Sequence, residues 1–349
     1  MTHSSAAGAT TLDLPSPYLL FLGDSTTADY AKTAFGLRDW APERCLAEWA
    51  LPGATISTGL PSLAPDAAVA HGARAVVIGV ANVGGHIPES WVAALVECIG
   101  AGLDVISGMH TRLTTLPALR EAAARHGRRL IDIRVPPDGI PIASGRKRGG
   151  RRLLTVGTDC ALGKKYTALA IARGLAAHGV SATFRATGQT GILIAGGGMP
   201  MDAVIADFEA GAAEILSPDN DPDHWDIIEG QGSLFHPAYA AVSLGLLHGS
   251  QPDVFVACHQ PGRTRIVGLE DFALPSLEEL IDLTLRLGRR TNPAIRCAGV
   301  SLNTAHLETA ARADLFAETG AVLGLPVADP MLPGPAFDAL IGAILQPSA

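Results

Sequence analysis

The fold of this chain is decided by residues 155–167, which read TVGTDCALGKKYT. The apolar residues 153–156 predict a buried strand, and residues 167–177 predict a helix. Phosphate-binding loops have this order of elements: a strand, then a glycine-bounded loop that ends in Gly-Lys, then a helix. Backbone N–H groups and the helix N-terminus point at the anion there, and the lysine adds a positive charge. We therefore expect a phosphate-bearing ligand at residues 157–164, the phosphate loop; the alternative is a structural glycine turn.

The phosphate loop departs from the usual G-x-x-x-x-G-K-[ST] spacing in two ways. Five residues separate Gly157 from Gly163, and Lys165 stands where Ser or Thr normally follows the Gly-Lys pair. Thr167 comes two positions later. Because that Ser or Thr hydroxyl normally holds magnesium, the sequence predicts phosphate binding without the usual magnesium ligand.

The composition is typical of a two-domain α/β protein in a reducing compartment. The chain has 349 residues, 48% of them hydrophobic, and 39 glycines, which is enough for two buried cores. A net charge of −8 and an aromatic content of 5% argue against nucleic-acid binding. The five cysteines lack CxxC spacing. We therefore expect a cytoplasmic protein with no structural zinc, and no metal at its site.

Residues 1–14 are expected to form a flexible tail. Residues 1–11 carry no Lys or Arg and no long apolar core, so they do not resemble a signal peptide. No uninterrupted apolar segment is long enough to span a bilayer. We expect neither a membrane nor a nucleic acid as partner, whereas a homo-oligomer is compatible with this surface.

Residues 15–135 alternate short apolar strands with helices. Strands are predicted at 18–24, 75–80, 104–110 (running into a turn) and 129–134, and helices at 88–100 and 116–126. This alternation is typical of a parallel sheet covered on both faces, and so of a Rossmann-like domain. The first turn, residues 23–28, lacks the G-x-G-x-x-G fingerprint, which disfavours NAD binding by this half.

Residues 136–152 are expected to link this domain to a second one at 153–346. The linker is rich in Pro and Gly and ends in a basic run at 146–152. The basic run is interpreted as a solvated connector or, if functional, as a contact for an additional phosphate. In the second domain, strands are predicted at 153–156, 181–186, 226–229, 253–258, 296–302 and 322–327, and helices near 165–178, 202–216, 236–248, 276–288, 305–319 and 336–346.

Polar residues follow the strands that neighbour the phosphate loop. Loops at the carboxyl ends of parallel strands line the ligand crevice. Glu229 ends a buried strand, and the glycines after it leave room for a ligand. It is the first candidate for a general base, or for contact with a metal and its waters. His236 and His259 are further candidate bases. The alternative is a structural role for His236 and a hydrogen-bond donor role for His259.

Other strand ends supply candidate ligand contacts. Arg263 and Arg265 can pair with a carboxylate or phosphate, and Asn303 can read an adenine edge or cap its strand. Further candidate substrate contacts are Gln189 and Thr190, in a loop expected at 187–191, together with Gln231 and Ser233. The candidate cofactor contacts at the phosphate loop are Gly157, Thr158, Asp159, Cys160, Gly163, Lys164, Lys165, Tyr166 and Thr167.

These motifs resemble two groups of proteins. Gly157-Thr158-Asp159 with Gly163-Lys164, Glu229-Gly230 and Asn303 are similar to the phosphate loop, strand-end acid and adenine-side asparagine of dethiobiotin synthetase. The chain resembles more closely a bacterial family long catalogued as a domain of unknown function, over nearly all of residues 15–345. The motifs that carry this second resemblance are GTDC and GK within 157–164, TGQTG at 187–191, EGQGS at 229–233 and CHQPGR at 258–263.

The second resemblance implies a Rossmann-like domain followed by a P-loop NTPase-like domain. The family includes the D-glutamate N-acetyltransferases, which use acetyl-CoA and work beside an enolase-superfamily enzyme in D-amino acid catabolism. The resemblance therefore implies a CoA-dependent N-acetyltransferase acting on an acidic amino acid such as D-glutamate. The phosphate loop would then hold the CoA pyrophosphate without hydrolysing anything.

Under this interpretation, the attacking amine loses its proton to Glu229, His236 or His259, with Glu229 ranked first. Lys165 or backbone amides would stabilise the oxyanion. Three alternatives stay open from the sequence: an ATP- and magnesium-dependent ligase or kinase of the dethiobiotin synthetase type, a non-catalytic nucleotide-binding protein, and an NAD-linked enzyme.

Overall fold

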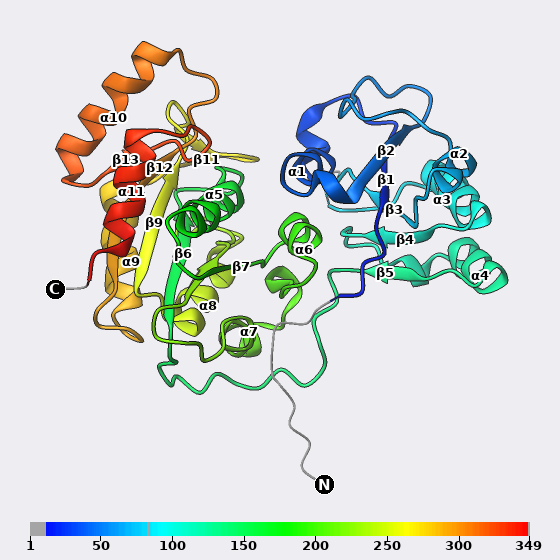
Figure 1. Cartoon of the computed structure of the whole chain (residues 1–349). Coiled ribbons are helices and arrows are strands. Elements are labelled where there is room, and N and C mark those ends of the chain that lie inside the picture. Colours follow the sequence, from blue (N-terminus) through cyan, green and yellow to red (C-terminus); the bar gives the residue numbers. More distant parts are fainter. Residues whose placement is uncertain (1–11, 82–83, 348–349) are drawn as a thin grey trace, which may run out of the picture. The chain divides into compact units, whose positions relative to one another are not determined.

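The computed structural model describes residues 12–81 and 84–347, and they form two compact α/β units (Figure 1). One unit contains residues 12–136 and 189–203, and the other contains residues 137–188 and 204–347. The segment 189–203 comes from the expected range of the C-terminal domain but belongs to the N-terminal unit. Most of the expected tail, residues 1–11, lies outside the described residues.

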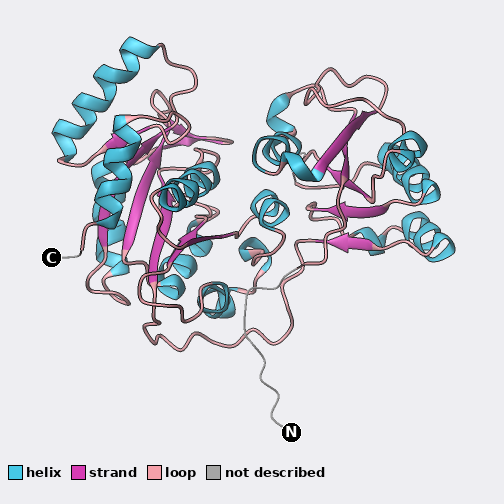
Figure 2. Ribbon diagram, viewed as in Figure 1, coloured by secondary structure: helices cyan, strands magenta, loops and turns pink. Residues whose placement is uncertain are grey.

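The N-terminal unit has a parallel sheet of five strands in the order β2-β1-β3-β4-β5 (Figure 2). Every residue of β1 is buried, as expected for a strand covered on both faces. Helices α2, α3 and α4 contribute to one core against this sheet. The bounds are β1 Tyr18–Gly23, β2 Cys45–Ala50, β3 Ala75–Ile78, β4 Asp104–Ser107, β5 Leu130–Asp132, α1 Lys32–Trp40, α2 Pro65–Ala70, α3 Glu89–Ala101 and α4 Pro117–His126.

Helix α6, Gln189–Ala195, occupies the stretch where a strand-end loop was expected. Its Ile192 and Leu193 are fully buried, and Thr190 Oγ1 lies 3.0 Å from Thr33 Oγ1 in a buried hydrogen bond. The Gln189 side-chain amide donates to the Gly108 carbonyl over 2.9 Å. The polar groups of both predicted substrate contacts, Gln189 and Thr190, are therefore bonded within the N-terminal unit.

The C-terminal unit has a parallel sheet of six strands in the order β13-β12-β9-β6-β8-β7, and a separate antiparallel hairpin, β10-β11. The strands are β6 Arg151–Gly157, β7 Ala182–Arg185, β8 Trp225–Ile228, β9 Val254–His259, β10 Arg265–Ile266, β11 Leu269–Ala273, β12 Arg296–Leu302 and β13 Val327–Ala328. The helices are α5 Lys164–Ala177, α7 Glu209–Leu216, α8 Ala240–Ser250, α9 Leu277–Gly288, α10 Thr309–Leu323 and α11 Pro335–Leu345.

Two cores cover the faces of this sheet. Val254 and Val256 of β9 pack in a core with α5 and α11. Ala257, on the opposite face because side chains alternate along a strand, packs in a core with α9 and α10. This parallel α/β architecture is the fold class predicted from the alternation of apolar runs. Among the described helices, none is both long and apolar enough to cross a membrane.

Two predicted elements of the C-terminal half are wrong in extent. The expected strand at 322–327 begins as the end of α10, which closes at Gly324 with φ of 64°, a conformation that favours glycine after a helix. Only Val327–Ala328 pair as a strand. The expected helix at 202–216 is two short 3-10 turns followed by α7.

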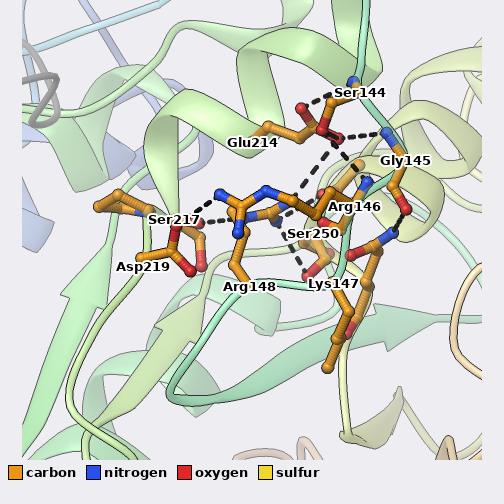
Figure 3. Close-up of polar contacts among 12 residues, drawn as sticks. Ser144, Gly145, Arg146, Lys147, Arg148, Glu214, Ser217, Asp219 and Ser250 are labelled. Carbon is orange, nitrogen blue, oxygen red and sulfur yellow. Dashed lines mark hydrogen bonds and ion pairs between the residues drawn. The ribbon is translucent and has the colours of Figure 1, made fainter.

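Two arginines of the basic run at 146–152 are buried, so the interpretation as a solvated connector applies only to its exposed residues, such as Arg146 and Lys147. Arg148 is 7% exposed and Arg152 is fully buried. Arg148 donates to the carbonyls of Ser217 and Gly249, both over 2.7 Å (Figure 3). These carbonyls belong to the C-terminal ends of α7 and α8, where backbone oxygens lack helical partners and a cation is favoured. The basic run thus fastens the linker to two helix ends.

Replacing Arg148 with Met is expected to lower the free energy of unfolding by about 3 kcal/mol, since buried carbonyls lose their donors. Affinity for ADP or CoA should not change. Chemical denaturation and ligand titration measure both quantities. Arg146→Met is the matched control, because Arg146 is exposed and pairs with Asp219 at the surface, where solvent screens such pairs and they add little to stability. Weaker ligand binding at unchanged stability would instead support a phosphate contact.

Candidate active site

The phosphate loop joins β6, in the middle of the C-terminal sheet, to the start of α5. Gly163 has φ of 108°, a conformation that side chains rarely adopt. It turns the chain directly into α5, whose first N–H groups lack partners within the helix. The loop therefore presents backbone donors and a positive helix end to an anion at the carboxyl edge of the sheet.

Lys164 is held in the mouth of the phosphate loop. Its side chain is 7% exposed, and Nζ donates to the carbonyl of Asp159 over 2.7 Å. An ammonium group has three N–H donors, so two are without partners among the described residues. Burial lowers the pKa of Lys164. A bound phosphate would supply the missing partners and favour the charged form.

Asp159 and Arg263 stabilise the conformation of the phosphate loop. The Asp159 carboxylate is fully buried and accepts from the N–H groups of Cys160 (2.6 Å) and Val267 (3.1 Å). Arg263 Nη1 reaches Asp159 at 3.2 Å and the Cys160 carbonyl at 2.9 Å. Arg263, predicted as a substrate contact, thus has its guanidinium engaged by the loop, whereas Arg265 is exposed on β10.

Glu229 directly follows β8 and is 4% exposed. Its Oε2 accepts from the N–H groups of Thr187 (2.9 Å) and Gly188 (3.1 Å), whereas Oε1 makes no hydrogen bond among the described residues. Burial raises the pKa of Glu229, and Lys165 and Lys164 partly oppose that shift. The site therefore contains a fixed carboxyl group with one free oxygen and a raised affinity for a proton.

The two candidate histidines differ in the hydrogen bonds that their ring nitrogens make. His236 Nδ1 accepts from the N–H of Ala238 over 3.1 Å, so the proton of the neutral ring lies on Nε2 and neither nitrogen is a free acceptor. This geometry favours a structural role. His259 Nδ1 lies 2.9 Å from Thr158 Oγ1, and burial and Arg263 lower the pKa of His259, which keeps its ring neutral near pH 7.

Asp159, Cys160 and His236 bring three possible metal ligands within 4.8 Å of one another. The Asp159 carboxylate is already engaged by Arg263 and two backbone N–H groups. The lone pair of His236 is taken by Ala238. Burial also raises the pKa of Cys160, so its thiol is not poised as a thiolate ligand. These three residues fit a metal poorly.

The remaining candidates surround this centre at the loop or at strand ends. The Thr167 hydroxyl bonds Ser301 Oγ over 2.8 Å, which engages it inside the sheet. Lys165 Nζ lies 4.4 Å from the Tyr166 ring centre. Gln231 donates to Thr187 Oγ1 over 3.0 Å. Ser233 is buried and caps the turn that follows it, and Asn303 accepts from Ala305.

Gly230 lies against Thr155 of β6, two residues after the end of β8. A Cβ atom there would lie 1.7 Å from the Thr155 carbonyl oxygen, and Gly230 N–H donates to Thr155 Oγ1. Gly230→Ala is therefore expected to lower the free energy of unfolding by about 3 kcal/mol or more. Thermal or urea denaturation measures it.

Gly342→Ala is the matched control, because an added Cβ on this residue of α11 meets no atom within 4 Å. It should be neutral or stabilising by up to about 1 kcal/mol. Equal stability of the two variants would contradict the close approach at Gly230.

Two domain models of one family match the chain in sequence. The DUF1611_N Rossmann-like domain matches residues 50–136, and the DUF1611_C P-loop domain matches residues 141–339. Both are described as domains of unknown function. The chain belongs to the DUF1611 family.

Characterised relatives and a solved structure extend over nearly the whole DUF1611 chain. A D-glutamate N-acetyltransferase of Tritonibacter scottomollicae is 50% identical over 317 residues, covering 91% of this chain and 95% of the relative. One from Pseudoalteromonas sp is 44% identical over 323 residues, covering 93% and 97%. The crystal structure of a DUF1611 protein from Anabaena variabilis is similar, with a TM-score of 0.86 and 32% identity over 95% of this chain and 100% of that one. These similarities identify the DUF1611 chain as an N-acetyltransferase.

Several residues that shape the site of this DUF1611 protein were missed from the sequence. Thr187 and Gly188 fix Glu229 through backbone N–H groups, which carry no side-chain signal. Val267 binds Asp159 from the turn of the β10-β11 hairpin. A signal for the hairpin did exist: the Gly268 turn lies between two short runs containing Ile266 and Leu269.

Proposed function

We propose that this protein transfers the acetyl group of acetyl-CoA to the amine of an acidic amino acid, with D-glutamate as the first acceptor to test. The observation that carries the proposal is the pairing of a phosphate loop with Glu229, a buried carboxyl group with one free oxygen at the neighbouring strand end. The names of the two relatives support the acceptor.

The phosphate loop suits the pyrophosphate of CoA. Lys164 contributes a charge with two free donors, and the loop and α5 contribute backbone N–H groups. The residue after Lys164 is a lysine, and the Thr167 hydroxyl is engaged by Ser301. Neither supplies the hydroxyl with which such loops usually hold magnesium. Binding without hydrolysis, and without magnesium, is therefore the behaviour that we propose.

Glu229 is placed to take the proton that the amine must lose. Its Oε2 is fixed by two backbone N–H groups, which leaves Oε1 as the accepting atom. Its raised pKa brings its proton affinity closer to that of a catalyst working near neutrality. The amine nitrogen forms a C–N bond to the acetyl carbonyl carbon and the C–S bond breaks. The proton taken up by Glu229 passes to the leaving sulfur, so CoA leaves as its thiol. Lys165 or a loop N–H would stabilise the carbonyl oxygen, and Arg265 is the remaining arginine for a substrate carboxylate.

Incubating the purified protein with acetyl-CoA and single amino acids in EDTA tests this proposal. We expect one free thiol for each N-acetylated product, fastest with D-glutamate among D- and L-glutamate and D- and L-aspartate. Thiol release would be followed with a thiol reagent and the product by mass spectrometry. Turnover that requires ATP and magnesium and yields ADP would instead establish the ligase or kinase alternative.

We also propose a metabolic role and a cellular location for this enzyme. N-acetylation would be a step of D-amino acid catabolism in the cytoplasm, beside an enolase-superfamily enzyme. Supplying D-glutamate as sole nitrogen source to cells lacking this protein tests the metabolic role. Unimpaired growth would contradict it.

A further inference from the structure

A groove of about 290 Å³ opens at the carboxyl end of β9. Its walls are His259, the start of α9 at Leu277 and Glu278, and the last turns of α10 at Glu318 and Val322. Its volume is close to the lower limit of the roughly 300–1,000 Å³ typical of ligand sites. None of the candidate cofactor or substrate contacts lines it, and His259 is the one candidate base that does.

The groove connects to the phosphate loop through one side chain. His259 lines the groove, and its Nδ1 lies 2.9 Å from the hydroxyl of Thr158 in the loop. The His259 carbonyl also accepts from the N–H of Asn303, over 2.9 Å, at the end of the next strand. A ligand anchored at the loop can therefore reach the groove past His259.

The strand order decides which end of that ligand enters the groove. The phosphate loop follows β6, which lies between β9 and β8. Glu229 follows β8, on one side, and the groove lies at β9, on the other. An acyl group that reacts beside Glu229 extends toward β8. The opposite, nucleoside end of the same molecule then extends toward β9 and the groove.

The chemistry of the groove suits an uncharged ring that carries an amino group. Leu277 and Val322 provide apolar walls. Val322 is 72% exposed, and it belongs to α10, a helix with no buried residue. Glu278 and Glu318 offer acceptors for an amino group and repel a phosphate. The neutral ring of His259 can donate or accept at the inner end.

We propose that this groove between α9 and α10 binds the adenine ring of the CoA whose pyrophosphate occupies the phosphate loop. The inference rests on the proposed CoA-dependent function. It adds a subsite in which α10 acts as the outer wall for the base. Free ADP, which shares the adenosine and pyrophosphate with CoA, should use the same groove.

Val322→Trp fills the groove from an exposed position, and Ala321→Trp places the same ring on the neighbouring exposed residue outside the groove lining. Calorimetric titration with ADP, CoA and inorganic pyrophosphate compares the two variants with the wild type. We expect Val322→Trp to weaken the binding of ADP and CoA about tenfold or more, because the adenine ring could no longer be buried in the groove. The affinity for pyrophosphate should be unchanged. Ala321→Trp should bind all three like the wild type. Unchanged pyrophosphate binding also shows that the loop and fold are intact.

The results distinguish a failure of the proposed adenine subsite from a failure of the proposed acetyl transfer. If Val322→Trp binds ADP and CoA like the wild type, the groove assignment is overturned even when acetyl transfer occurs. If the wild type transfers no acetyl group but Val322→Trp selectively loses ADP, the reaction is refuted and the base subsite stands. With an active wild type, Val322→Trp should raise KM for acetyl-CoA but not for S-acetylpantetheine, which lacks adenine.

Discussion

Replacing Lys164 with Met is expected to weaken acetyl-CoA binding by roughly two orders of magnitude or more, because the proposed phosphate would lose the buried charge that binds it. Methionine keeps most of the side-chain volume in a site that is 7% exposed. The Asp159 carbonyl loses its donor, but the loop retains the brace between Asp159 and Arg263. Calorimetric titration gives the affinity, and the effect should be equally large for ADP and pyrophosphate.

The stability of the same variant provides the internal check. Burial lowers the pKa of Lys164, so the folded protein disfavours the ammonium form relative to the unfolded chain. Charged Lys164 therefore lowers the free energy of unfolding. This loss of stability is fully present below the lowered pKa and disappears as the pH rises through the pKa of an unfolded lysine. Lys164→Met should therefore melt no lower than the wild type at pH 7. Lys32→Met, at an exposed lysine of the N-terminal unit, should leave the affinity for acetyl-CoA unchanged. Intact acetyl-CoA affinity in Lys164→Met would contradict the assignment of the phosphate loop.

Replacing Glu229 with Gln is expected to lower kcat by roughly 10²–10⁴-fold, the usual contribution of a general base. The amide oxygen can still accept the N–H bonds of Thr187 and Gly188, so the loop should keep its shape and acetyl-CoA its affinity. Steady-state kinetics with saturating acceptor separates kcat from KM. A variant with full turnover would place the base elsewhere.

The pH profile gives a second readout for Glu229. The base works only when deprotonated, so activity should rise with pH through its pKa. Because burial raises that pKa, the acid limb should lie above the ordinary range of a glutamate, and it should vanish in the residual activity of Glu229→Gln. His236→Asn is the matched control, since Asn Oδ1 can replace Nδ1 as acceptor for Ala238. A lost acid limb in His236→Asn, with Glu229→Gln unaffected, would identify His236 as the base.

The sequence was most informative where the residues of a site are neighbours in the chain or lie at the ends of neighbouring strands. The phosphate loop is a continuous stretch between a strand and a helix, and its function depends on glycines and one lysine. The position of Glu229 at the strand end beside the loop could be predicted because buried parallel strands bring their carboxyl ends to one edge. Both inferences need only the order of elements along the chain.

The errors arose where distant segments decide the environment of a residue. Arg148 and Arg152 carry the sequence signature of an exposed connector, yet the carbonyls that bury them come from α7, α8 and the segment after α7. Arg263 has the pattern of a substrate contact, but Asp159 engages it from within the loop. Helix α6 belongs to the N-terminal unit through Thr33 and its apolar side chains, a pairing that no local pattern specifies.

We propose that the phosphate loop binds a CoA thioester without a metal. Titrating the wild-type protein with acetyl-CoA in EDTA, alone and in the presence of pyrophosphate, tests this binding directly. We expect saturable acetyl-CoA binding in EDTA, which pyrophosphate competes away and Lys164→Met loses. No binding of acetyl-CoA in EDTA, with ATP bound only when magnesium is added, would contradict it.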